Sequence, residues 1–351
     1  MARTVFIVQG EGRGHLSQSA ALKEYLENAG HTVEAVFTGC NNRHSLPTYY
    51  RTLFGDRLQC FASPFFLRTP NKKGIYVGLT ILFNLFRSPL YVREAGRIRR
   101  EITRLNPHVV FNFYDVVGAL ALQKGSPSVK RIGIGHHFLL HLEGYRCPGG
   151  NTLHKWFLRL HTLTVMRSCD KVLALSFREL PGNEQITVVP PLVRERFRNA
   201  TRKEGPATLI YLLNEGFASD ITTIAKNNPD FQADIFSELP TETPMPPSIR
   251  LHAINDQAFL EKMESCRNLV TTAGFDTVAE AAYMGVPLGV VPVRNHFEQR
   301  CNSFDIERSG LGISLDGFSA EGLRGIKKSD KLWFRLWVDR AGEMIINQME
   351  E

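Results

Sequence analysis

The sequence predicts an α/β protein of two successive domains, each built on a parallel sheet with helices on both faces. Short apolar runs alternate with segments of helical period along the chain, and this alternation is typical of parallel sheets. A polar and charged stretch at residues 194–205 interrupts the alternation once, after which it starts again. The length of 351 residues also suits two domains of about 100–200 residues each.

The first domain, residues 1–193, opens with a strand at 4–8, a glycine loop at 10–15 and a helix that begins near Leu16. Apolar residues in this helix follow the i, i+3, i+4, i+7 spacing of one buried face. Further strands are predicted at residues 31–37, 108–113, 131–135, 171–175 and 186–189.

The second domain, residues 206–326, starts with a predicted strand at 207–213. Its further strands are expected at 249–252, 269–271 and 288–291, and its helices at 256–266 and 275–284. The last segment, residues 327–351, contains an amphipathic helix at 330–348. The apolar face of that helix must pack on another part of the protein.

The composition is that of a soluble globular protein, with 43% hydrophobic and 22% charged residues. Intrinsic disorder, collagen and a small disulfide-bonded scaffold are therefore excluded. The formal charge of +7 indicates an anionic partner, for which nucleic acid, a nucleotide ligand and an anionic membrane surface are all candidates. The basic residues are dispersed and are not interleaved with aromatic residues, which disfavours nucleic acid.

The sequence also predicts the cellular location of the protein and the redox state of its cysteines. The N-terminus lacks the long apolar region of a secretory signal, and no stretch approaches the ~20 apolar residues that span a bilayer. Six cysteines lie far apart without a CxxC pair, so zinc and redox motifs have no support. We therefore expect reduced thiols in a cytoplasmic protein.

The most informative motif is TTAGFDTVAE at residues 271–280, which predicts a strand end, a glycine turn and a helix N-terminus. Unpaired backbone N–H groups and the helix dipole make such a point a phosphate site. Gly274 permits close approach, and Thr272 or Thr277 can add a hydroxyl donor. Glu280 lies one turn past Thr277, where its carboxylate can accept from both hydroxyls of a ribose. The alternatives are a purely structural glycine and a solvated helix glutamate.

The next strand leads to an acid–amide pair, Glu298 and Gln299. An acceptor beside an amide suits sugar hydroxyls. The N-terminal loop, GEGRGH at residues 10–15, is a second glycine-rich turn before a helix. It does not match the GxGxxG pattern, and no carboxylate ends the second strand at 36–38, so a nicotinamide dinucleotide site is disfavoured.

The run TxxGxxTxxE, followed by GVP, VP and the acid–Gln pair, resembles the donor-site signature of GT-B glycosyltransferases. It is most similar to the bacterial family that makes lipid II from lipid I, and to macrolide and plant UDP-sugar transferases. The loop at 10–15 resembles their N-terminal glycine loop. The resemblance implies two Rossmann-like domains facing a cleft, with the last helix crossing back to the first domain. It also implies an inverting, metal-independent transfer from a UDP-sugar, with no cofactor.

The resemblance assigns roles to individual residues. Glu280 would hold the ribose, Thr272, Gly274 and Phe275 would follow the diphosphate, and residues 253–255 would read the base through their backbone. Glu298 and Gln299 would face the donor sugar. The full set of expected donor contacts is Gly14, Asn214, Ala253, Ile254, Thr272, Gly274, Phe275, Thr277, Glu280, Glu298 and Gln299.

Two catalytic candidates lie in the first domain. His15 stands in the first turn of the first helix, where a histidine of near-neutral pKa can take a proton from an acceptor hydroxyl. It could equally cap the helix or pack. Asp115 follows the strand at 108–113 and could orient His15 as in a catalytic triad, or cap the following helix.

Three further histidines, at 136, 137 and 141, could line an acceptor cleft. No DxD string occurs in the sequence, and we predict no metal site.

An apolar segment at residues 74–87 precedes four arginines, at 93, 97, 99 and 100. It predicts either a buried helix with a basic solvated end, or a patch that contacts anionic lipid or a lipid-linked acceptor.

The sequence thus predicts a glycosyltransferase that uses a nucleotide-diphospho-sugar and a small or lipid-linked acceptor. It would act in the cytoplasm or peripherally on the inner face of the cell membrane, on cell-envelope glycan. The alternatives are a nucleotide-sugar epimerase and a non-catalytic nucleotide-sugar-binding subunit.

Overall fold

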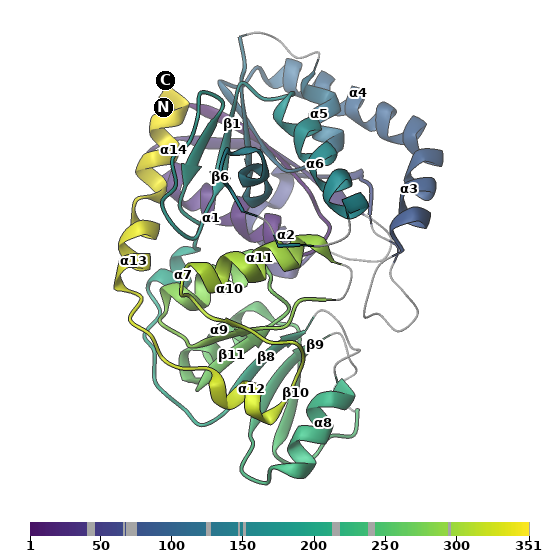
Figure 1. Ribbon diagram of the computed structural model, residues 1–351. Coiled ribbons are helices and arrows are strands. Elements are labelled where there is room, and N and C mark those ends of the chain that lie inside the picture. Colours follow the sequence, from purple (N-terminus) through teal and green to yellow (C-terminus); the bar gives the residue numbers. More distant parts are fainter. Residues whose placement is uncertain are drawn as a thin grey trace. The chain divides into compact units, whose positions relative to one another are not determined.

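The computed structural model describes residues 1–40, 46–65, 67, 76–123, 128–146, 148–149, 152–212, 218–237, 243–293 and 296–350. These residues form two compact units, each with one parallel sheet (Figure 1). The first unit comprises Met1–Leu67, Val77–Arg194 and Trp337–Glu351, and the second is built on Glu195–Leu336. Two α/β units with parallel sheets are the predicted fold class, which is confirmed. No helix among the described residues combines the length and the apolar character needed to cross a bilayer.

The first unit has a seven-stranded sheet in the order β3-β2-β1-β4-β5-β6-β7. Its strands are β1 (Arg3–Val8), β2 (Thr32–Cys40), β3 (Leu58–Ala62), β4 (Val109–Phe113), β5 (Lys130–Gly135), β6 (Lys171–Leu175) and β7 (Ile186–Val189). Its helices are α1 (Gly14–Asn28), α2 (Thr48–Phe54), η1 (Gly55–Arg57), α3 (Val77–Phe86), α4 (Ser88–Leu105), α5 (Val116–Leu122), η2 (His136–His141), α6 (Thr152–Met166) and α14 (Ala341–Glu350). The strand order reverses between β1 and β4, and this reversal is where such sheets bind ligands.

Both faces of the first sheet are buried. Val5 and Ile7 point to the face covered by α4 and α5. Phe6, between them, points to the opposite face and packs edge-on against Phe111 and Phe113. Since successive side chains of a strand alternate between faces, an unbroken apolar run is what a strand buried on both sides requires.

The second unit has a six-stranded sheet in the order β10-β9-β8-β11-β12-β13. Its strands are β8 (Thr208–Leu212), β9 (Ala233–Ser237), β10 (Ile249–Ala253), β11 (Asn268–Thr271), β12 (Leu288–Val290) and β13 (Ile313–Ser314). Its helices are α7 (Glu195–Arg198), α8 (Ala218–Asn227), α9 (Asp256–Ser265), α10 (Phe275–Tyr283), α11 (Phe297–Arg308), α12 (Ala320–Gly325) and the first turn of α13 (Leu332–Asp339). Here the order reverses between β8 and β11, so both units share one strand arrangement around their reversal point.

The C-terminal segment differs from the prediction. The single helix expected at 330–348 is two helices, α13 and α14, interrupted at Arg340. Lys331 donates to the carbonyl of Val286 within the second unit, whereas the Trp337 indole donates to the carbonyl of Ser176 within the first. The segment assigned to the first unit therefore begins at Trp337 rather than at 327. Its helix α14 lies beside α1 (Figure 1).

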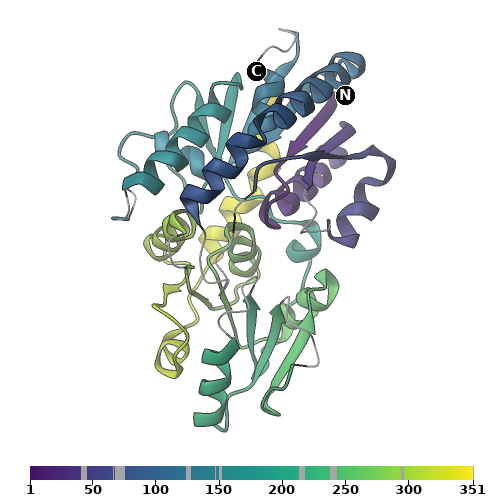
Figure 2. The same cartoon turned by 90° about the vertical axis from the view of Figure 1, so that its right-hand side faces the viewer.

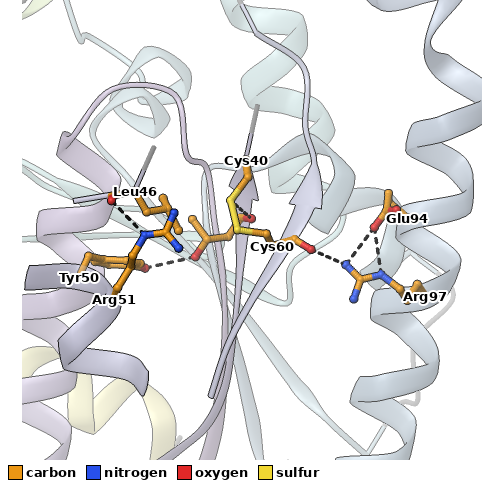
Figure 3. The surroundings of a disulfide bond; sticks show 8 residues. Cys40, Leu46, Tyr50, Arg51, Cys60, Glu94 and Arg97 are labelled. Carbon is orange, nitrogen blue, oxygen red and sulfur yellow. Dashed lines mark hydrogen bonds and ion pairs between the residues drawn. A yellow bond between two sulfur atoms is a disulfide. The ribbon is translucent and has the colours of Figure 1, made fainter. Parts of the chain in front are cut away.

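The expectation that all cysteines are reduced is wrong for one pair. Cys40 and Cys60 form a disulfide (Figure 3). Their strands, β2 and β3, are parallel neighbours whose register brings the two Cα atoms to 5.6 Å, within the range that a disulfide spans. Sequence spacing alone did not reveal this pairing. Cys169, Cys266 and Cys301 are free and buried, as expected.

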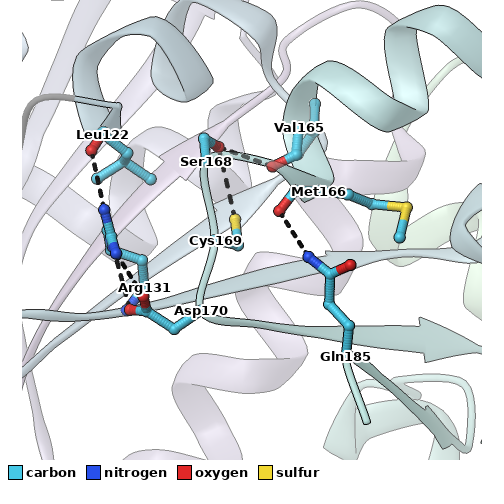
Figure 4. Close-up of polar contacts among 8 residues, drawn as sticks. All are labelled: Leu122, Arg131, Val165, Met166, Ser168, Cys169, Asp170 and Gln185. Carbon is cyan, nitrogen blue, oxygen red and sulfur yellow. Dashed lines mark hydrogen bonds and ion pairs between the residues drawn. The ribbon is translucent and has the colours of Figure 1, made fainter. Parts of the chain in front are cut away.

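A carboxylate fixes the amino-terminal edge of the first sheet (Figure 4). Asp170, just before β6, accepts from both the backbone N–H and the guanidinium of Arg131 on β5, and its own N–H donates to the Arg131 carbonyl. Burial acts against ionisation, but the hydrogen bonds from Arg131 outweigh it and lower the pKa of Asp170. This edge is opposite to the one that carries the candidate site.

Candidate active site

Both units turn from strand to helix in the same unusual way. Tyr114 follows β4 with φ 60°, and Ala273 follows β11 with φ 57°. Residues with a Cβ rarely adopt this left-handed conformation, and those that do cluster at functional sites. Each turn adjoins the point where its sheet reverses strand order. The two turns therefore mark the ligand-binding edge of each sheet.

The helices that follow these turns are capped differently. In the first unit Asp115 caps α5, because its carboxylate accepts from the backbone N–H of Gly118 over 2.7 Å. In the second unit Gly274 stands at the N-cap of α10, which has no side-chain cap among the described residues. An uncapped N-terminus presents N–H groups and the positive end of the helix dipole to an anion. Of these two turns, the second therefore leaves the N-terminus of its helix without a side-chain cap, as the predicted phosphate contact requires.

The predicted donor residues of the second unit gather at this turn and the helix after it. Thr272 and Phe275 are buried, and Thr277 is half-buried. A Cβ placed on Gly274 would meet no atom of the described residues within 4 Å, so that part of the chain leaves the space in front of the turn open. Glu280 is only 2% exposed, although an ordinary solvated helix glutamate would be exposed. Burial of a carboxylate one turn beyond Thr277 disfavours the solvated alternative.

In both units, a side chain of a later helix contacts the backbone carbonyl of the residue with the left-handed conformation. Asn302 on α11 donates from Nδ2 to the carbonyl of Ala273 over 3.0 Å. His161 on α6 lies with Nε2 3.2 Å from the carbonyl of Tyr114. Each of these helices follows the next strand along the chain, so the contact is topologically equivalent in the two units. Sequence reasoning missed Asn302, His161 and Tyr114, because no local motif marks them.

The acid–amide pair lies in the first turn of α11. The carbonyl oxygen of the Gln299 side chain accepts from the backbone N–H of Val293 over 2.8 Å. The backbone N–H of Gln299 donates to Nδ1 of His296, which caps the helix. Burial lowers the pKa of His296. Glu298 is half-buried beside them. The side-chain oxygen of Gln299 is thus already bonded to the backbone of Val293.

The remaining predicted donor residues lie at other strand ends. Ala253, the last residue of β10, is exposed, and Ile254 after it is half-buried. Asn255 then caps α9 by accepting from the N–H of Ala258. Asn214 lies outside the described residues.

The glycine loop of the first unit has structural reasons for two of its glycines. A Cβ on Gly10 would lie 1.5 Å from the carbonyl oxygen of Gly39, so β1 and β2 can approach only with glycine there. Gly12 has φ 80°, which favours glycine. Gly14 is the first residue of α1, whose N-cap, Arg13, makes no side-chain cap.

His15 has an ordered imidazole. Its Nδ1 lies 3.1 Å from Oε1 of the buried Gln18, one turn later on α1. A carbonyl oxygen only accepts, so Nδ1 carries the ring proton and the basic lone pair is on Nε2. The expected pair of His15 with Asp115 is not formed within the described residues. The two carboxylate oxygens of Asp115 accept from Ser63 and Gly118 instead.

Asp115 therefore takes the alternative role, that of a helix cap, and this interpretation is confirmed. Burial raises the pKa of Asp115, although the hydrogen bonds from Gly118 and Ser63 act against the shift. An aspartate at an N-cap lies within reach of the N–H three residues later, which is why the local contact forms.

Aromatic rings surround Tyr114. The rings of His15 and His161 stack on it, with centroid distances of 5.8 and 4.8 Å, and His137 is tilted at 5.2 Å. Of the three histidines expected near an acceptor, His137 is thus in this cluster, and Nδ1 of His136 lies 2.8 Å from the carbonyl of Leu175. Burial lowers the pKa of the third, His141. The described residues contain no group of three or more His, Cys, Asp or Glu that could hold a metal ion.

Comparisons with known proteins identify the family and the fold of the chain. The profile of glycosyl transferase family 1 matches residues 2–324. A rice protein (Oryza sativa subsp. indica), UDP-glycosyltransferase CGT, is 36% identical over 90 residues, which are 26% of this chain and 19% of that protein. The match thus spans about a fifth of the length of the curated relatives.

Solved structures resemble the whole chain. The glycosyltransferase of kitacinnamycin superposes with a TM-score of 0.65 at 15% identity, covering 99% of each chain. Medicago truncatula UGT71G1, complexed with UDP-glucose, superposes with a TM-score of 0.64 at 12% identity, covering 100% of this chain and 98% of its own. The family profile covers most of the chain and the fold covers nearly all of it. The chain belongs to glycosyl transferase family 1 and has the GT-B fold.

Proposed function

We propose that the protein transfers a sugar from a UDP-sugar to the hydroxyl of an acceptor, with the donor held by the second unit. The observation that carries this proposal is the uncapped N-terminus of α10, with open space before Gly274 and the buried carboxylate of Glu280 beyond it. The diphosphate binds the N–H groups at that helix end, and Glu280 binds the ribose hydroxyls. The names of the rice and Medicago proteins support a uridine nucleotide.

The remaining donor contacts follow from the same strand edge. The base lies against the backbone of Ala253 and Ile254, and the sugar lies near Glu298 and Gln299. Gly14, the first residue of α1, stays a donor contact predicted from the resemblance. These positions stay predictions until a donor complex is solved.

The proposed chemistry is a single displacement. The acceptor oxygen forms its bond to the anomeric carbon while the bond between that carbon and the diphosphate oxygen breaks. The bonding electrons leave with the nucleotide diphosphate, and the acceptor proton passes to Nε2 of His15. One displacement inverts the anomeric configuration. The dipole and N–H groups of α10 stabilise the leaving diphosphate, so we propose that no metal is required.

Asp115 has no direct part in this proton transfer, because both of its oxygens are engaged in capping α5 and in the bond from Ser63. The same engagement disfavours the epimerase alternative, which needs carboxylates that exchange protons with the sugar.

The acceptor is proposed to be lipid-linked, presented at an anionic membrane surface. One face of α3 is exposed: Leu85 and Phe86 have exposures of 66% and 78%, against a buried Thr80 on the other face. The helix α4 follows α3 directly (Figure 2). It carries the exposed Arg93 and Arg100. Apolar area joined to basic charge is the combination that binds anionic interfaces. The alternative of a buried helix with a basic solvated end is wrong for this face of α3.

Sedimentation with vesicles tests the membrane contact. We expect binding to vesicles with anionic lipid, and its loss in the double variant Leu82→Glu, Phe86→Glu. The matched control is Leu332→Glu, Leu336→Glu, which places the same charges on exposed leucines of α13. If the two double variants sediment with anionic vesicles to the same extent, the proposed membrane contact of α3 is wrong. The cytoplasmic location stays a prediction.

A thermal-shift panel of nucleotide sugars tests the donor site. One or more UDP-sugars should raise the melting temperature of the wild type, and Glu280→Ala should abolish that increase. A donor that stabilises both proteins equally would place the nucleotide elsewhere. A donor that binds without transfer to any acceptor would favour the non-catalytic alternative.

A further inference from the structure

The backbone of Tyr114 is in a conformation that needs support. A left-handed φ costs a residue with a Cβ about 1–2 kcal/mol, so surrounding contacts must hold it there. Glycine, which adopts this conformation without that cost, would be the simple solution. Tyrosine instead brings a ring and a hydroxyl to this position, and both make contacts.

Two neighbouring residues of α6 hold Tyr114 at both of its ends. A carbonyl oxygen only accepts, so Nε2 of His161 donates to the backbone carbonyl of Tyr114. The Thr162 hydroxyl donates to the carbonyl of Leu158, and it therefore accepts from the Tyr114 hydroxyl. The backbone and the ring tip of Tyr114 are thus tied to the same helix.

The ring of Tyr114 lies against the imidazole of His15, with an angle of 23° between the planes. Gln18 contacts Nδ1 of the same imidazole. The carboxylate that sequence reasoning expected in this role, Asp115, is engaged elsewhere. An amide and a tyrosine ring thus both contact the imidazole of His15.

We infer that His161 and Thr162 are positioning residues of the transfer reaction: they hold Tyr114 in its left-handed conformation, and Tyr114 in turn fixes the imidazole of His15. This inference rests on the proposed function, in which His15 is the base. It assigns to α6 a role in the chemistry although neither residue need touch the substrates.

Two variants of His161 separate its hydrogen bond from its ring. In His161→Gln, the amide nitrogen reaches a position near that of Nε2 and still donates to the Tyr114 carbonyl, but the ring is lost. In His161→Phe, the stacked ring remains and the donor is lost. For Thr162→Val, Thr164→Val is a matched control, because Thr164 lies on the same helix and also donates to the carbonyl four residues earlier.

The first readout needs no substrate. NMR of histidines labelled at Cε1 resolves the titration of His15, whose signal is the one missing in His15→Gln. We expect the titration midpoint of His15 to move by about half a pH unit in His161→Phe and in Thr162→Val. It should stay at its wild-type value in His161→Gln and Thr164→Val.

The second readout is transfer. His161→Phe should lower kcat by about tenfold with little change in the KM for the donor, because the base loses its geometry while the donor site in the other unit is untouched. His161→Gln should restore kcat to within about threefold of the wild type.

An unchanged His15 titration in His161→Phe would overturn the inference, and so would a loss of activity in His161→Gln equal to that in His161→Phe. Failure of the proposed function looks different. In that case His15→Gln would retain transfer while the variants of α6 still moved the His15 titration.

Discussion

The side-chain amide of Asn302 donates a hydrogen bond to the carbonyl oxygen of Ala273 over 3.0 Å. This contact joins a buried residue of α11 to the left-handed residue that precedes α10. The turn it holds is the one whose N–H groups we propose to bind the diphosphate. A distant helix therefore determines the shape of the proposed donor site.

Asn302→Ala should weaken donor binding and lower stability. Loss of a buried hydrogen bond costs about 1–3 kcal/mol, since the Ala273 carbonyl keeps no partner for that bond. Urea unfolding gives the stability, and calorimetry with the donor gives the affinity. The control is Asn228→Ala, which removes another amide-to-carbonyl bond in the same unit, to Ile224. Equal donor affinity in the two variants would contradict a role for Asn302 at the donor site.

Gly274→Ala tests whether a ligand occupies the open space before α10. A Cβ there meets no protein atom, and φ is −70°, so the variant should fold with unchanged or slightly higher stability. Donor affinity should fall by about tenfold, because the methyl group would press on the diphosphate. Gly317→Ala adds a methyl group in equally open space of the same unit and serves as the control. Wild-type affinity in Gly274→Ala would show that no ligand group approaches this turn.

Local pattern predicted the regular elements well. The strands at 171–175 and 186–189 were predicted to the residue, because each is an apolar run bounded by polar residues. β3 and β9 were not predicted, since Gln59 and Asp234 interrupt their apolar runs. Their place in a sheet depends on neighbouring strands that no local window contains.

The residues of the candidate site also fall into those that a local pattern predicts and those that it does not. The turn around Gly274 was predicted, because its residues are adjacent in the sequence and form a motif. His161 and Asn302 were not, since each acts on a residue about 30 to 50 positions away. Helix capping by Asp115 was open beside the dyad, and the choice depended on the hydrogen bond from Ser63, a residue 52 positions earlier in the chain.

Asp115→Asn distinguishes a cap from a catalytic dyad. The variant should lose about 1–2 kcal/mol of stability, because the cap to Gly118 and the bond from Ser63 are weakened. The pH at which transfer falls to half on the acid side should not move, since Asp115 does not bind His15. Ser319→Ala removes the side-chain cap of α12 and controls for the loss of a cap far from His15. A shift of that pH by about one unit or more, in Asp115→Asn alone, would restore the dyad.

Lys331 predicts a pH dependence of stability. It is buried and donates to the carbonyl of Val286, and burial lowers its pKa to about 7. In the unfolded chain the same group keeps its proton up to a pH of about 10.4. Between these values the unfolded state binds more protons, so the free energy of unfolding should rise with pH, by at most about 1.4 kcal/mol per pH unit. This gain in the free energy of unfolding is lost again as the pH falls back toward 7.

Urea unfolding at pH 7, 8 and 9 measures this slope. Lys331→Met keeps a long apolar side chain and removes the titrating group, so its stability should rise less with pH than that of the wild type. Lys328→Met changes an exposed lysine three residues earlier, paired with Glu204, and should retain the wild-type slope. The free thiols of Cys169 and Cys266, whose pKa values burial raises to about 12, titrate alike in all three proteins, so they cancel in the comparison. Parallel curves for the wild type and Lys331→Met would mean that Lys331 stays protonated in the folded protein, with the Val286 carbonyl compensating its burial.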